Sequence, residues 1–322
     1  MPAVRAFRIA YDGRSFSGFQ RQPDVPTVED VLFDALDDLD VADLPRGPSG
    51  RRPRPPGYAA AGRTDAGVSA AAQTITLNAP DWLTPRAFNG QLPKQVRVWA
   101  AADVPDDFHA THDATRRTYR YHLYAPRDAG SPADGRTDAG VESGLPAAAP
   151  LVDDDRVRTA LARLAGEHDF HNLTPDERGT VRTIETGVDR DADLLVIEVS
   201  AGGFPREFVR RLVTLVRAIG TGDAPLSRID RLLAAEPASG PDGVGPAPPT
   251  PLVLWDVDYV PSDAPDTVDR TGQSLQFDPD PEAVASACVA FGEEHTSARH
   301  AAAATDALRR RIGSEPSSVR RS

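Results

Sequence analysis

The sequence predicts an α/β protein made of two related lobes, and three observations support this fold class. Stretches with a two-residue period, typical of strands, alternate with stretches whose apolar residues recur every three or four positions, typical of helices. The same order of strands and helices occurs twice along the chain. A length of 322 residues suggests two domains or one large lobed domain. We therefore expect lobes over residues 1–112 and 113–260, followed by a tail over 261–322 whose role the sequence does not reveal.

The first lobe opens with a predicted strand at Val4–Ala10 and a helix over about Thr27–Val41. Thr27 and Asp30 resemble a capping box at the start of that helix. One apolar stripe predicts its buried side: Val28, Val31, Leu32, Ala35, Leu36 and Leu39. Two further strands are expected in this lobe, with room for a helix between them: Gln73–Leu77 and Val96–Ala101.

The second lobe repeats this order, beginning with a strand at Arg117–Tyr124. A helix over Asp154–Ala165 ends at Gly166. Its predicted inward residues are Val157, Ala160, Leu161 and Leu164. The other predicted elements are strands at Val181–Asp189, Leu194–Ser200 and Leu252–Tyr259, a helix at Arg206–Ile219, and a Gly- and Pro-rich linker at Ala238–Pro251. In the tail, Glu282–Phe291 and Ser297–Ile312 have helical patterns.

The composition predicts a cytoplasmic, salt-adapted protein. A single cysteine, Cys288, excludes an intrachain disulfide, and no stretch resembles a signal peptide or a membrane span. The net charge of -12 is unusual for an RNA-binding protein, because phosphate contacts from Lys and Arg normally dominate affinity. Lys94 is the only lysine, however, and arginine supplies nearly all the positive charge. At 1 M salt the Debye length falls to about 3 Å, so an acidic surface costs little through repulsion.

The most informative motif is the heptapeptide Gly-Arg-Thr-Asp-Ala-Gly-Val at residues 62–68. It places the carboxylate of Asp65 in a turn between two glycines, whose backbone freedom would let an RNA backbone or a flipped base come close. The strand predicted after it would hold the turn rigid. On residue chemistry alone a structural turn is the favoured interpretation, since Asp and Gly are ordinary turn residues.

The whole heptapeptide, however, resembles the catalytic motif of the tRNA pseudouridine synthase A family. Other segments resemble that family in the same order: Gly18–Gln22, Asn89–Pro93, Pro105–Ala110, Arg117–Tyr121, Gly166–Phe170 and Phe204–Val213. The resemblance runs from about Val4 to about Val260. It implies the pseudouridine synthase fold, in which antiparallel sheets of two lobes join across a central active-site cleft. The acidic, arginine-based composition suggests a haloarchaeal member.

A second copy of the heptapeptide occupies residues 135–141 and carries Asp138. It lies in a stretch from Ala125 to Pro150 that is rich in Gly, Pro, Ala and Asp and has neither helical nor strand periodicity. This stretch follows the Tyr119 segment, where the family has a connecting loop. We therefore assign catalysis to Asp65 and interpret Asp138 as a surface loop residue.

The resemblance also implies roles for single residues. Asp65 would be the nucleophile, or would stabilise charge at the sugar, and Arg210 would pair with it and hold it in place. Tyr119 would stack on the target uracil and accept a proton. Arg63 resembles the arginine that fills the space left by the flipped base. Without the resemblance, aromatic alternation at Tyr119 and Tyr121 would indicate core packing.

Arginines cluster near these motifs, and four are candidates for contact with RNA phosphate: Arg117, Arg120, Arg206 and Arg211. A guanidinium is planar, stays charged and binds phosphate through two parallel hydrogen bonds. Arg206 and Arg210 are four residues apart and would share a helix face. The family commonly has histidines where this chain has Arg206 and Glu207. For Arg309–Arg311 in the tail we favour a solvated face.

Together these features imply an isomerase that converts uridine to pseudouridine at positions 38 to 40 of the tRNA anticodon stem-loop, acting as a homodimer without membrane attachment. No cofactor is implied. No metal site is expected either, because the pairs His109/His112 and His168/His171 lack the further ligands of a zinc signature. Whether the reaction passes through a covalent sugar adduct or a glycal stays open.

Two alternatives deserve a test. One is a catalytically silent RNA-binding protein of the same fold, against which stands the joint presence of Asp65, Tyr119 and Arg210. The other is a hydrolase that uses Asp65 as a nucleophile on a sugar substrate. Against this hydrolase, the sequence lacks the second acid motif that most glycosidases use.

Overall fold

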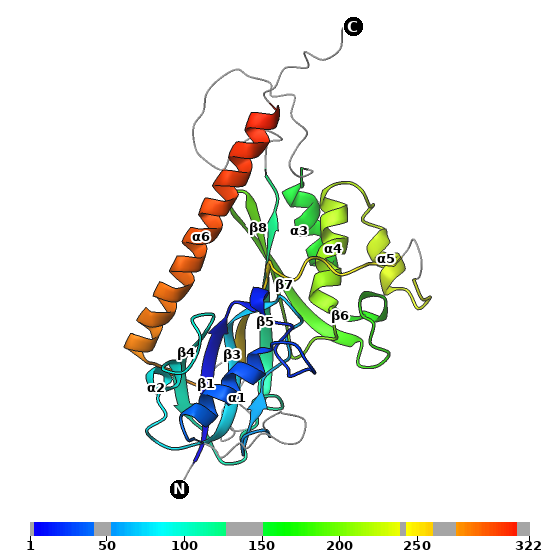
Figure 1. The fold of residues 1–322 in the computed structure, drawn as a ribbon. Helices are drawn as coiled ribbons and strands as arrows, with labels where there is room; N and C mark the ends of the chain where they lie inside the picture. Colours follow the sequence, from blue (N-terminus) through cyan, green and yellow to red (C-terminus); the bar gives the residue numbers. More distant parts are fainter. Residues whose placement is uncertain (1–2, 42–52, 127–150, 239–242, 260–274, 314–322) are drawn as a thin grey trace.

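The computed structural model describes residues 3–41, 53–126, 151–238, 243–259 and 275–313. These residues form one large mixed sheet with helices packed on it (Figure 1). The strands lie in the order β10-β4-β1-β3-β9-β5-β8-β7-β6, and β2 pairs with β3. Their bounds are β1 Ala3–Tyr11, β2 Ala59–Ala60, β3 Ser69–Ala79, β4 Val96–Asp103, β5 Ala114–Tyr124, β6 Gly166–Asp169, β7 Val181–Asp191, β8 Leu194–Ala201, β9 Leu252–Tyr259 and β10 Asp278–Pro279.

The two predicted sheets are joined into one by β9. This strand pairs antiparallel with β5 along most of its length and parallel with β3 at Ser69 and Ala70. The other strand pairs are antiparallel. The prediction of antiparallel sheets therefore holds except at this seam. There, the last predicted strand of the second lobe lies against the strand that follows the heptapeptide of residues 62–68.

In the first lobe, α1 (Val28–Asp38) begins as its capping pattern predicts. The Thr27 hydroxyl accepts a hydrogen bond from the Asp30 backbone N–H and donates one to the Asp30 carboxylate. The helix ends three residues earlier than expected because Leu39 leaves the helical region and Asp40 adopts a positive φ of 52°. Two short helices complete the lobe: η1 (Gly13–Ser15) and α2 (Pro85–Asn89), which occupies the room predicted between the strands.

In the second lobe, α3 (Asp154–Leu164) buries the four residues that its pattern predicts. The predicted helix at Arg206–Ile219 is α4 (Phe208–Gly220), which starts two residues late. The cause is Glu207, whose left-handed backbone (φ 59°, ψ 2°) cannot continue a helix. Three short elements were not predicted: β6 (Gly166–Asp169), α5 (Arg228–Leu233) and η2 (His171–Leu173).

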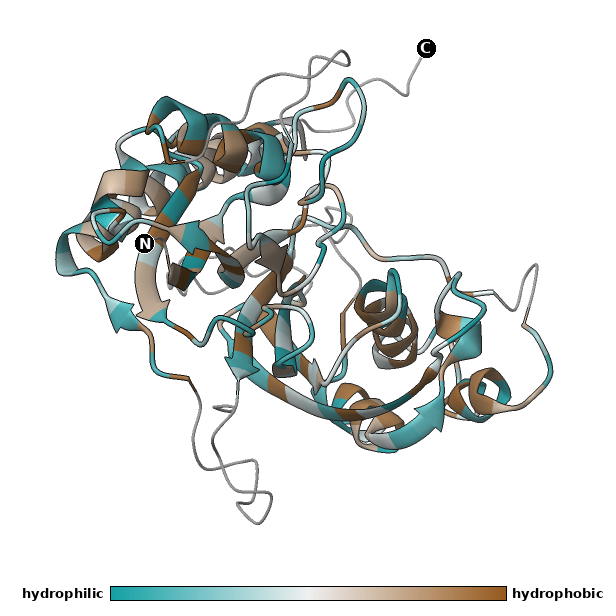
Figure 2. Cartoon of the chain, turned by 90° about the horizontal axis from the view of Figure 1, so that it is seen from below, coloured by the Kyte–Doolittle hydropathy of each residue, from teal (hydrophilic) through white to brown (hydrophobic). Residues whose placement is uncertain are grey.

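Each lobe has its own hydrophobic core. Residues of α1, β1, β3 and β4 form one cluster, and residues of α3, α4, α5, β5 and β8 form the other. The helices show mixed apolar and polar sides in Figure 2, as expected for amphipathic helices packed on a sheet. Tyr119 packs partly buried against both clusters. The seam of the sheet is therefore also the boundary between the two cores.

The tail contains one long helix, α6 (Pro281–Gly313), in place of the two predicted helices. The residues between the two predicted segments, such as Glu293, Glu294 and His295, are compatible with helix and do not interrupt it. The second heptapeptide, with Asp138, lies outside the described residues. No helix in the described part of the chain is long and apolar enough to cross a membrane.

Candidate active site

The loop that carries Asp65 runs from Gly62 to Val68 and leads directly into β3. Its backbone is held from the neighbouring loop: Phe19 N–H donates to the Thr64 carbonyl at 3.1 Å, and Gly67 N–H donates to the Phe16 carbonyl at 3.2 Å. Gly67 has a φ of 79°, a conformation that glycine adopts without strain. The sequence predicted this rigid turn, although its bracing by residues 16–19 could not be read from the pattern.

A buried polar chain lies beneath the loop. The Tyr11 hydroxyl and the Thr64 hydroxyl are 2.8 Å apart, and both side chains are buried. The Gln73 amide donates to the Gly62 carbonyl at 2.9 Å. Burial raises the pKa of Tyr11 well above its ordinary value, so this phenol stays neutral and can keep its hydrogen bond. These contacts tie the residues on both sides of Asp65 to strands β1 and β3.

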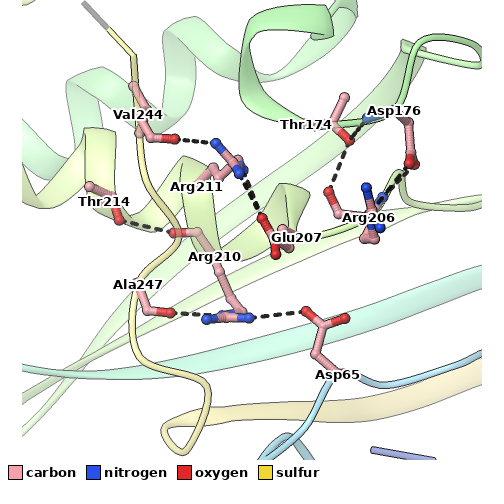
Figure 3. Close-up of polar contacts among 10 residues, drawn as sticks. All are labelled: Asp65, Thr174, Asp176, Arg206, Glu207, Arg210, Arg211, Thr214, Val244 and Ala247. Carbon is pink, nitrogen blue, oxygen red and sulfur yellow. Dashed lines mark hydrogen bonds and ion pairs between the residues drawn. The ribbon is translucent and has the colours of Figure 1, made fainter. Parts of the chain in front are cut away.

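Arg210 reaches Asp65 from the other lobe (Figure 3). Its Nη1 lies 3.1 Å from Asp65 Oδ2, and its Nε donates to the Ala247 carbonyl at 2.7 Å. The Arg210 side chain is 14% exposed and that of Asp65 is 35% exposed. The guanidinium is thus fixed through Nε, while its Nη1 holds one oxygen of the Asp65 carboxylate. The structure brings these two predicted residues together.

The segment predicted as a linker also belongs to this site. The Ala247 N–H donates a hydrogen bond to the Arg210 carbonyl at 3.0 Å, and the Ala247 carbonyl accepts one from the Arg210 side chain. Two residues farther on, Pro249 lies against the loop of Asp65. A Cβ added to Gly67 would be 3.1 Å from the Cγ of Pro249. This segment therefore contacts both α4 and the loop of Asp65. The composition of this segment had predicted only a linker.

Tyr119 lies on β5 next to the seam, on the same side of the strand as Tyr121. Its ring meets Phe204 edge to face with centroids 5.3 Å apart. Burial raises the pKa of Tyr119 to about 12; nearby Arg117 opposes this rise, and the negative charge of Asp65 adds to it. Tyr119 is therefore a neutral phenol near Asp65. Tyr121 is buried in the second core, as packing alternation predicts.

Arg117 is held by backbone carbonyls. Its guanidinium donates twice to Ala61 O, at 3.0 and 2.7 Å, and once to Thr111 O at 2.8 Å, and it also contacts Gly202 O. Burial lowers the pKa of Arg117 from its ordinary value. Through these bonds Arg117 connects Ala61, the residue before Gly62, with residues of both lobes. The sequence did not indicate this role. Contact of Arg117 with RNA stays a prediction.

Arg120 points to the opposite face of β5 from Tyr119, as expected for adjacent strand residues. Its Nε lies 2.8 Å from Glu198 Oε2, and its guanidinium lies over the Trp255 ring at 4.0 Å. The structure therefore does not bring Arg120 to Asp65. Its predicted RNA contact would have to occur on the other face of the sheet.

Two further predicted arginines, Arg206 and Arg211, lie around the start of α4 (Figure 3). Arg206 precedes the helix, so the expectation that it shares a helix face with Arg210 is wrong; its side chain is 62% exposed and faces Asp176. Arg211 pairs with Glu207 at 2.7 Å and donates to Val244 O at 2.6 Å. Arg63 is exposed beside Asp65.

The histidines that we considered as metal ligands do not gather with further ligand side chains among the described residues. The ring centroids of His109 and His112 lie 4.2 Å apart with the ring planes tilted by 35°, and His168 meets Phe170 edge to face. Among the described residues, no three His, Cys, Asp or Glu side chains gather closely enough to hold a metal ion.

Comparison with known proteins gives consistent findings. A family model described as tRNA pseudouridine synthase matches residues 160–260. The tRNA pseudouridine synthase A of Haloarcula marismortui is 50% identical over 303 residues, covering 94% of this chain and 98% of the relative. The protein of that name from Natronomonas pharaonis is 55% identical, covering 80% and 85%. That from Methanocella arvoryzae is 34% identical, covering 79% and 84%.

Proposed function

This chain belongs to the tRNA pseudouridine synthase A family, and from that premise we propose that it modifies uridines 38 to 40 of the tRNA anticodon stem-loop. The chain is a tRNA uridine-to-pseudouridine isomerase. The observation that carries the site assignment is the contact of Asp65 with Arg210, in which the two lobes each supply one residue.

The reaction changes the uracil atom that is bonded to C1′ of the ribose from N1 to C5. The N1–C1′ glycosidic bond of uridine breaks, the uracil turns, and a C5–C1′ bond forms. The proton on C5 is lost and N1 gains one, so the product is an isomer and no external group or electron is needed. Two demands follow: a group that assists departure at the electron-poor C1′ and a group that accepts the C5 proton.

We propose that Asp65 meets the first demand. A carboxylate can attack or stabilise an electron-poor anomeric carbon, as in glycoside chemistry. Arg210 would orient it, because the Nε bond to Ala247 fixes the guanidinium and leaves Nη1 directed at Oδ2. Asp65 and Arg210 then act as one unit held between the catalytic loop and α4.

Tyr119 would meet the second demand. Its ring lies near Asp65, where a flipped uracil could stack on it. With a pKa of about 12 it is a neutral hydroxyl at neutral pH. Its oxygen would therefore take the C5 proton only as its own proton passes to water or to the Asp65 carboxylate. Arg63, exposed next to Asp65, is placed to occupy the gap left by the flipped base.

We further propose that the enzyme acts as a homodimer in the cytoplasm, with tRNA recognised by shape and backbone more than by sequence. Family membership supports the homodimer. The composition, with one cysteine and arginine-based positive charge, supports an intracellular, salt-rich setting.

The test is to incubate the purified protein with unmodified tRNA transcript at high salt and to map pseudouridine by carbodiimide chemistry. We expect signals at one or more of positions 38 to 40. Release of free uracil would indicate the hydrolase, and tight binding without modification would indicate the silent RNA-binding protein. Signals elsewhere would keep the activity and reject the position.

The two copies of the heptapeptide allow a matched pair of variants. Asp65→Ala should abolish pseudouridine formation and leave tRNA binding nearly intact, because the carboxylate acts in chemistry. Asp138→Ala changes the same motif and should be near neutral. Loss of activity in Asp138→Ala alone would reverse the assignment.

A further inference from the structure

The helix α6 has two halves with different surroundings. The first half rests on β4 and α2 and buries Ala283, Ala287 and Ala290. Beyond Glu294, the described side chains up to Leu308 are exposed except that of Asp306. Figure 1 shows the helix, in orange and red, continuing well past α2 and β4. At 1.5 Å per residue, the part after Glu294 is about 28 Å long.

The charges on α6 change sign where it leaves the body of the protein. Its anchored half carries only acidic charges, and these pair with the body: Glu282 with Arg86, Glu293 with Lys94, and Glu294 with both Lys94 and Arg14. The sequence of its second half, residues 295–313, contains four arginines, two histidines and a single acid, Asp306. This basic segment is unusual in a chain of net charge -12.

The point of departure lies near the catalytic loop. Arg14, the partner of Glu294, belongs to η1. The adjacent Gly13 packs so closely on the loop that an added Cβ would be 2.1 Å from the Val68 carbonyl oxygen. Val68 follows Asp65 by three residues. The helix therefore leaves the body from the structure that braces the active-site loop.

The second half is suited to remain helical without tertiary contacts. It contains Ala301–Ala304, the residue type with the highest helix propensity. It therefore extends as a stiff rod, whereas a flexible basic tail would lose more entropy on binding.

We propose that residues 295–313 of α6 form an arm that binds the phosphate backbone of the substrate tRNA outside the target nucleotide. The inference rests on the proposed function, because tRNA is the polyanion that must approach the adjacent loop. Arg299, which is exposed, is the contact that we assign first.

The test compares charge reversals of equal size. Arg299→Glu alters the arm, whereas Arg158→Glu alters an exposed arginine on α3 that pairs only with Asp155 in the same helix. Arg299→Glu/Arg311→Glu enlarges the effect. We expect the double variant to raise the Kd for full-length tRNA about 10-fold at the lowest salt at which the protein stays folded. The slope of log Kd against log salt should become shallower by about 1 to 2. Arg158→Glu should do neither.

Two controls separate this inference from the proposed function. Turnover at saturating tRNA should be unchanged in the arm variants, because the arm does not touch the reacting atoms. Absence of pseudouridine in the wild-type reaction would overturn the function itself. Wild-type affinity and salt slope in the double variant would overturn the arm alone. Sedimentation showing that the arm variants dissociate a dimer, with unchanged tRNA affinity per site, would also overturn it, since the arm would then bind a second copy.

Discussion

Asp65 is held from two sides that differ in sequence position and in chemistry. The hydroxyls of Tyr11 and Thr64 fix the loop from below, and the Arg210 guanidinium fixes the carboxylate from the opposite lobe. Both contacts restrict the carboxylate without a covalent or metal link among the described residues. Small displacements of a reacting group can lower turnover considerably, so each contact should be visible in kinetics.

Arg210→Lys should lower turnover by about 10-fold or more while KM changes little. A lysine keeps the charge, but one ammonium cannot bond Ala247 O and reach Asp65 Oδ2 in the same geometry. Single-turnover assays measure the effect. The neighbouring Arg211→Lys is the control, since Arg211 contacts Glu207 and Val244. Equal turnover in both variants would remove the orienting role of Arg210.

Tyr11→Phe should lower both stability and turnover, whereas Tyr259→Phe should lower stability alone. Each loses one buried hydroxyl contact, to Thr64 or to the Ala110 carbonyl, worth about 1 kcal/mol. Only the first contact supports the loop of Asp65. Urea unfolding and turnover at saturating tRNA separate the two effects. The positioning role of Tyr11 fails if both variants turn over equally well.

At the level of elements, sequence patterns predicted what depends on neighbours in the chain. The strand at Leu252–Tyr259 has the predicted bounds, and α3 buries the four predicted residues. The pattern could not show the left-handed Glu207 that delays α4, nor that the Ala247 segment would hold Arg210. Both features depend on contacts between residues that are distant in sequence. A local sequence pattern contains no information about such partners.

The same limit applies to the arginines. Their clustering near motifs was visible, but the bonds that occupy them were not. Arg117 is surrounded by carbonyls, and Arg120 faces away from Asp65 because adjacent strand residues point to opposite faces. Asp65, Tyr119 and Arg210 were chosen as candidates because whole motifs resembled a family.

Strands β5 and β9 predict a pH dependence, since each carries a buried tyrosine. Burial, the leading cause, raises the pKa of Tyr119 and of Tyr259 from 10.0 to about 12. The folded state thus favours the neutral phenols, and their contribution to stability is complete below pH 10 and lost as the pH rises toward about 12. Urea unfolding at stepped pH should show the free energy of unfolding falling in this window. A constant value across it would contradict the burial argument.

At the scale of the whole molecule, the acidic surface and the RNA-binding task make opposite demands on salt. Repulsion within a chain of net charge -12 is strongest when salt is dilute, whereas phosphate contacts weaken as salt rises. We propose that the chain meets both demands in concentrated salt by binding RNA through local clusters of arginine on an acidic exterior.

Activity should therefore peak at intermediate or high salt. Folding should weaken at low salt, while the tRNA affinity of the folded fraction should rise. A circular-dichroism titration beside a binding titration measures both trends. Full folding and highest activity in dilute buffer would mean that the acidity has another cause.

The position of β9 has a consequence for biosynthesis. One edge of β5, and the edge of β3 at Ser69 and Ala70, lack their partner until residues 252–259 have left the ribosome, because β9 pairs with both strands. At about 5 to 20 residues per second, β3 waits roughly 10 to 40 s for this partner. The nascent first lobe is thus exposed to edge-to-edge aggregation during that time. Arg210 and Ala247 also emerge late, shortly before β9, so the contacts that hold Asp65 form near the end of synthesis.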